Sequence, residues 1–182
     1  MRIAVLTALA SVSLVACGQN AAPTNNSIAD NATNSTEATE NAVIPAAAPA
    51  TKEEALKIMH ERHEGMEQIG KSTKAIKRQL NSSTPDVAEI QKAAATIAEL
   101  AAKSPNWFPQ GTGPDVGKTG AKPEIWQNYP DFAAKDRDFE KAAQAFDAAA
   151  KTGDLTQIKA GFADLGKSCK ACHDKYRSDM HH

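Results

Sequence analysis

The residues of this chain most suited to chemistry are two cysteines and a histidine at positions 169–173, which read Cys-Lys-Ala-Cys-His. Two thiols at this spacing can each bond to one of the two vinyl groups of a haem, and the adjacent imidazole can bind its iron. The motif therefore predicts one covalently attached haem c, held by Cys169 and Cys172, with His173 as an axial iron ligand.

A Cys-x-x-Cys pair also occurs in thioredoxin-like redox centres and in zinc sites. A redox pair normally lies in a βαβ context, whereas this one lies near the end of a predicted helix with no strand pattern around it. A zinc site needs two further Cys or His ligands, for which His181 and His182 are the candidates along the chain. Haem attachment is the favoured interpretation, and these two alternatives stay open.

The elements that position the motif are predicted to be helices, because from residue 51 onward the apolar residues recur at helical spacing. Cofactor sites in helical bundles lie between facing helices. We expect an all-α fold, an antiparallel up-down four-helix bundle with a covalently attached haem. Its helices are predicted over about 51–80, 84–103, 130–152 and 154–176, with a long irregular connection at 104–122 and a short helical turn at 123–126.

Local signals mark where these helices begin. Thr51 followed by Glu54 forms a capping-box pattern. Thr84 is expected to cap the second helix, with Pro85 in its first turn, where a missing N–H does no harm. Asp154 is expected to cap the last helix.

The last helix is predicted to turn both cysteines toward the core. Apolar residues follow one another at intervals of three and four, which is the spacing of one helix face. The positions are Leu155, Ile158, Phe162, Leu165, Cys169, Cys172 and Tyr176. In the helix before it, Phe132, Phe139 and Phe146 repeat every seven residues and predict a second buried face.

The N-terminal part is predicted to be an export and anchoring segment. Residues 1–17 combine one positive charge with a short apolar run. The run ends at Cys17 in a pattern that resembles a bacterial lipoprotein box, so we expect Cys17 to be lipidated and to anchor the chain to a membrane. Residues 18–50 hold few charges and no aromatic residue, which predicts a disordered tether.

Composition narrows the range of functions. The formal net charge is −1, so no strong basic field predicts binding to nucleic acid. Beyond the haem motif the sequence presents no evident acid–base set, and we expect that the protein is not an enzyme.

Three segments resemble the class II c-type cytochromes, the cytochrome c prime group. The first is Cys-Lys-Ala-Cys-His-Asp-Lys-Tyr-Arg at 169–177, the second is Lys-Pro-Glu-Ile-Trp at 122–126, and the third is Gly-Asp-Leu at 153–155. The resemblance extends over residues 51–182. It implies a four-helix bundle, often a homodimer, exported to the periplasm where the haem is attached. It also implies that Arg177 lies beside the iron-binding histidine.

The resemblance also indicates which residue occupies the sixth coordination position of the haem iron. High-spin members place an apolar side chain there and bind small gases, whereas low-spin members place a methionine there. Residues 57–66 resemble the low-spin pattern, which implies Met59 as second iron ligand, with His63 as an alternative. A Met ligand suits electron transfer. We therefore expect one-electron transfer to redox partner proteins, with nitric oxide or carbon monoxide binding as the alternative.

Overall fold

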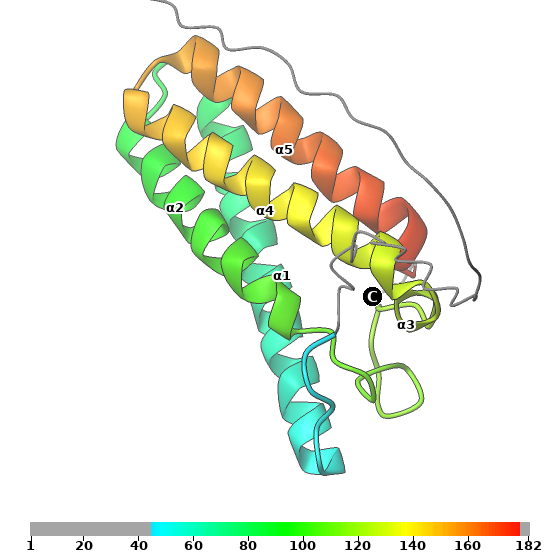
Figure 1. Ribbon diagram of the computed structural model, residues 1–182. Coiled ribbons are helices and arrows are strands. Elements are labelled where there is room, and N and C mark those ends of the chain that lie inside the picture. Colours follow the sequence, from blue (N-terminus) through cyan, green and yellow to red (C-terminus); the bar gives the residue numbers. More distant parts are fainter. Residues whose placement is uncertain (1–44, 179–182) are drawn as a thin grey trace, which may run out of the picture. The chain divides into compact units, whose positions relative to one another are not determined.

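The computed structural model describes residues 45–178, and the regular elements in that range are all helical (Figure 1). The four long helices are α1 (Lys52–Leu80), α2 (Val87–Lys103), α4 (Tyr129–Thr152) and α5 (Leu155–Tyr176). The 3₁₀ turn η1 (Ser104–Asn106) and the short helix α3 (Glu124–Gln127) lie in the connection between α2 and α4. The predicted all-α bundle is confirmed. The predicted signal peptide (1–17) and most of the tether (18–50) lie outside the described residues.

The helices pack in chain order: α1 against α2, α2 against α4, and α4 against α5. Short turns join α1 to α2 and α4 to α5, so these neighbours run antiparallel (Figure 1). None of the helices within 45–178 is long and apolar enough to cross a bilayer.

Most of the predicted helix ends are confirmed by their caps. The Thr51 side chain accepts a hydrogen bond from the Glu54 amide, and the Glu54 carboxylate accepts one from the Thr51 amide. The Asp154 carboxylate accepts from the amides of Thr156 and Gln157. Gly153, with φ of 73°, ends α4 in the left-handed conformation that glycine adopts without steric cost.

The predicted cap of the second helix was wrong by two residues. Asp86, not Thr84, is the N-cap, and its carboxylate accepts from the Glu89 amide. The Gln79 side chain, from the last turn of α1, accepts from the Asp86 amide at 3.0 Å. A contact from the preceding helix therefore holds Asp86 at the capping position.

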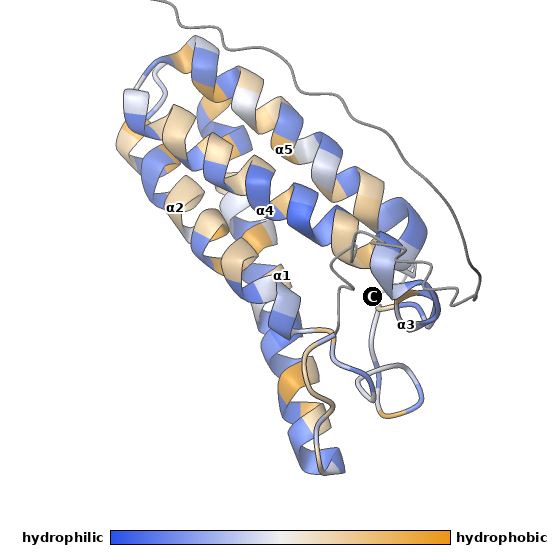
Figure 2. Cartoon of the chain, in the orientation of Figure 1, coloured by the Kyte–Doolittle hydropathy of each residue, from blue (hydrophilic) through white to orange (hydrophobic). Residues whose placement is uncertain are grey.

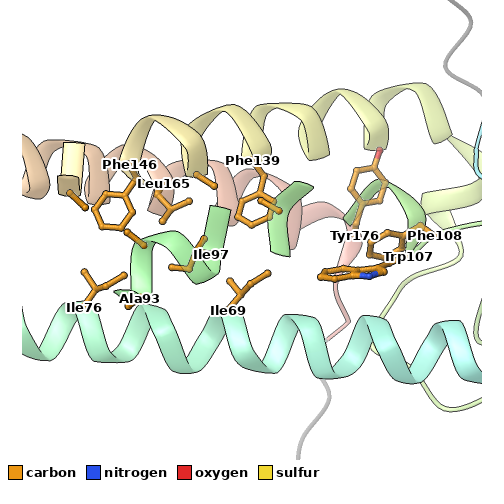
Figure 3. Packing of buried hydrophobic residues seen from close by; sticks show 14 of the residues in the cluster. Ile69, Ile76, Ala93, Ile97, Trp107, Phe108, Phe139, Phe146, Leu165 and Tyr176 are labelled. Atoms are coloured by element: carbon orange, nitrogen blue, oxygen red, sulfur yellow. The ribbon is translucent and has the colours of Figure 1, made fainter. Parts of the chain in front are cut away.

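The core is formed by all four long helices, with side chains such as Ile69 of α1, Ile97 of α2, Phe146 of α4 and Leu165 of α5 (Figure 3). Each long helix turns an apolar face inward and a charged face outward (Figure 2). Phe132, Phe139 and Phe146 are all buried, as their spacing predicts. Cys169 and Cys172 pack half-buried against the same apolar cluster, so the predicted core-facing position of the cysteines is confirmed.

Candidate haem-binding site

The last turns of α5 bring the motif residues together. Cys169 and Cys172 lie one helical turn apart, both carry free thiols, and both are half-buried. His173 follows on the same turn, and part of its surface is exposed to solvent. The arrangement offers two thiols on one helix face and an imidazole beside them.

Burial keeps the donor atoms of this group uncharged. It raises the pKa of the Cys169 thiol, and it raises that of Cys172 to about 11 with a smaller contribution from the nearby Asp136 carboxylate. Desolvation lowers the pKa of His173, and the positive charge of Arg177 lowers it further. A neutral imidazole is the form that binds iron.

The end of α5 is fixed to the rest of the bundle through Tyr176. Its ring packs edge-on against Phe132 of α4, with centroids 5.4 Å apart, and its hydroxyl donates to Asp131. The Lys122 amide donates to the Tyr176 carbonyl at 2.9 Å. The turn that carries Cys172 and His173 is therefore held by both α4 and the connection.

Arg177 lies directly after α5. Its amide donates to the His173 carbonyl at 3.1 Å, and its side chain is exposed. Its positive charge contributes to the lowered pKa of the His173 imidazole, and a role for Arg177 at the haem stays a prediction.

Met59 lies inside the protein on α1, with 7 % of its surface exposed. A Cβ built on Gly117 would stand 3.3 Å from the Met59 Cε and 3.8 Å from its sulfur, so the thioether packs against the connection. Met59 is not a member of the apolar cluster that Cys169 and Cys172 join. The structure therefore brings Cys169, Cys172 and His173 together on α5, and iron ligation by Met59 stays a prediction.

The other candidate iron ligands on α1 are more exposed than Met59. His60 and His63 are both exposed, whereas Met66 is half-buried against the apolar cluster. In this part of α1 the buried sulfur is therefore that of Met59.

Sequence reasoning missed Arg62, which is 4 % exposed and lies one turn after Met59. Its guanidinium donates to the carbonyls of Trp107 and Thr112 and to the hydroxyls of Thr112 and Thr119, at 3.0–3.3 Å. It also stacks over the ring of Phe108 at 5.0 Å. Arg62 thus fastens the connection to α1. Its position on the buried stripe, three residues after Met59, was the available signal.

A second missed group is the Asp136 carboxyl on α4, which is 6 % exposed and accepts a hydrogen bond from the Ser104 hydroxyl at 2.7 Å. Burial raises the pKa of Asp136 to about 6. The signal in the sequence was its place one turn after Phe132, on the buried face of α4.

The donor set fits a covalently held haem. Two uncharged thiols one turn apart face an apolar cluster, and a neutral imidazole stands next to them. Within residues 45–178, no group of three or more His, Cys, Asp or Glu side chains is placed to hold a bare metal ion. A zinc site among the described residues is thereby disfavoured, and His181 and His182 lie outside them.

Comparison with known proteins agrees with this fit. The family model described as Cytochrome C' matches residues 57–177. A cytochrome c prime of Alcaligenes xylosoxydans is 37 % identical over 109 residues, which cover 60 % of this chain and 80 % of the relative.

Two solved structures are similar to the chain. A cytochrome c prime described by its ligand-controlled dimer dissociation has a TM-score of 0.64 and 32 % identity, covering 72 % of this chain and all of that one. The nitric oxide complex of a mutant cytochrome c prime from Alcaligenes xylosoxidans has a TM-score of 0.57 and 32 % identity, covering 73 % and 100 %. The chain belongs to the cytochrome c prime family of haem proteins, which bind covalently attached haem c.

Proposed function

We propose that the protein is a low-spin electron carrier in which Cys169 and Cys172 hold the haem and His173 and Met59 bind the iron. The observation that supports this is the burial of Met59 on a turn where both histidines are exposed. When bound, the haem supplies one iron that alternates between ferric and ferrous. A thioether ligand favours the ferrous state and suits one-electron transfer.

The chain's own residues would shape this chemistry in three ways. Cys169 and Cys172 fix the haem to α5, Tyr176 holds that turn rigidly against α4, and the connection shields the Met59 side from water. Rigid ligands that stay in place in both redox states are what a carrier needs, because little then reorganises when the electron arrives.

The optical spectrum of the holo-protein tests this proposal. We expect sharp split bands on reduction, a weak far-red sulfur-to-iron band when oxidised, and no change with carbon monoxide. Met59→Ala removes the far-red band and opens the iron to carbon monoxide, whereas the control Met66→Ala leaves both properties unchanged. A high-spin spectrum in the wild type, shifted by carbon monoxide, contradicts the Met59 assignment.

Gas binding is the second candidate, and one observation favours it. Met59 packs against Gly117 rather than in the cluster that Cys169 and Cys172 join, so an open distal position is compatible with the fold. A similar cytochrome c prime forms a nitric oxide complex as a mutant. The carbon monoxide experiment separates the two functions.

Location and assembly are further parts of the proposal. Family membership supports a periplasmic site of action, and the Cys17 pattern supports a lipid anchor followed by the tether 18–50. The existence of a dimeric relative supports a homodimer, and a carrier also requires redox partner proteins at its surface.

A further inference from the structure

The buried carboxyl of Asp136 faces the haem-attachment side of α5. Two ring contacts fix how α4 and α5 are aligned: Phe132 meets Tyr176 at 5.4 Å, and Phe146 meets Phe162 at 5.7 Å. The two helices are antiparallel. Asp136, one turn after Phe132, therefore lies opposite Cys172, one turn before Tyr176.

The Ser104 hydroxyl can serve the Asp136 carboxyl in either of its protonation states. The Ser104 hydroxyl lies 2.7 Å from Asp136 Oδ1 and 2.8 Å from the Ala101 carbonyl oxygen. A hydroxyl has a single hydrogen to donate. If Asp136 is ionised, the Ser104 hydroxyl donates to it, and the Ala101 carbonyl still accepts the Ser104 backbone amide. If Asp136 is protonated, it donates to Ser104, which donates to Ala101. The surrounding groups therefore satisfy both the ionised and the neutral carboxyl, as a proton-binding site requires.

The charges around Asp136 are few. Glu140 and Arg137 act on it from its own helix with opposite signs, and Tyr129 lies on the same helix. Cys172 faces it from α5 and the uncharged Ser104 from η1. Desolvation outweighs these influences and raises its pKa to about 6.

We propose that Asp136 is a proton-binding site linked to the redox state of the haem held at Cys172. A one-electron donor converts ferric to ferrous iron, and the Asp136 carboxylate takes one proton from water to become the neutral acid. The added electron and the added proton cancel in charge, which matters in a site with little water. The proposal depends on haem attachment at Cys172 and not on ligation by Met59.

The test is the midpoint potential of the holo-protein as a function of pH. An ionised Asp136 stabilises ferric iron, so the potential falls as pH rises through the pKa of Asp136 near 6, with a slope of at most ~59 mV for each tenfold drop in proton concentration. In Asp136→Asn this slope disappears and the potential stays at or above the acidic wild-type value. The control Asp138→Asn, an exposed change of equal charge on α4, keeps the slope.

Two further readouts keep the test decisive if the asparagine variant folds poorly. Redox-difference infrared spectra should gain a protonated carboxyl band on reduction. Ser104→Ala removes the hydrogen bond that favours the ionised form, so the sloping region moves to higher pH. A slope unchanged in Asp136→Asn or unmoved in Ser104→Ala overturns the proposal, and the optical spectrum of each sample reports Met ligation independently.

Discussion

The guanidinium of Arg62 is a buried charge whose partners are the carbonyls and hydroxyls of Trp107, Thr112 and Thr119. Burial lowers its pKa to about 10, which leaves it charged at neutral pH. Its partners form the connection that covers Met59. Arg62 is therefore one of the contacts that hold this part of the connection against α1, together with the packing of Trp107 on Gly65.

We expect Arg62→Met to lower the free energy of unfolding by about 2–4 kcal/mol, because buried acceptors lose their donors. Thermal unfolding of the holo-protein measures the loss, and limited proteolysis within 107–119 localises it. Arg78→Met is the matched control, since Arg78 is exposed and pairs with Glu89 at the surface, and it costs less than about 1 kcal/mol. Equal losses in the two variants would show that the connection does not depend on Arg62.

At the scale of the elements, α1 approaches the connection so closely at one point that no side chain fits. A Cβ on Gly65 would stand 2.3 Å from Trp107 Cη2. The indole therefore lies directly on the helix backbone. Gly70, five residues further along α1, has no such neighbour within 4 Å.

These two glycines predict opposite responses to the same substitution. Gly70→Ala stabilises the helix by about 0.5–1 kcal/mol, because alanine is the better helix former. Gly65→Ala must displace Trp107 and destabilises the protein by about 1–3 kcal/mol. Denaturant unfolding of both holo-variants measures the difference, and stabilisation by Gly65→Ala would refute the close packing described here.

The helices follow from local sequence, whereas the buried charges do not. The caps at Thr51 and Asp154 depend on residues within one turn, so sequence alone predicts them. The start of α2 depends on Gln79 from another helix, and the prediction failed there. The roles of Arg62 and Asp136 depend on partners many residues away, and apolar periodicity cannot indicate which polar residue on a buried face finds such partners.

At the scale of the whole molecule, the expected lipid on Cys17 would decide where the protein is found. Several acyl chains bind a membrane firmly, since each buried CH₂ contributes roughly 0.8 kcal/mol. In bacteria that export the full chain, we expect the wild type in the membrane fraction and Cys17→Ser in the soluble periplasmic fraction. The haem spectrum of both fractions should be the same. Release of the wild type by salt alone would contradict a lipid anchor.

The packing of the helices in chain order bears on how quickly the protein folds. Bundles whose contacts join neighbouring segments fold within microseconds to milliseconds. Here each long helix packs against the long helix that follows it in the chain. Cys169 and Cys172 become half-buried once α5 has packed on the bundle. We therefore expect the attachment of haem to compete in time with the packing of α5 on α4.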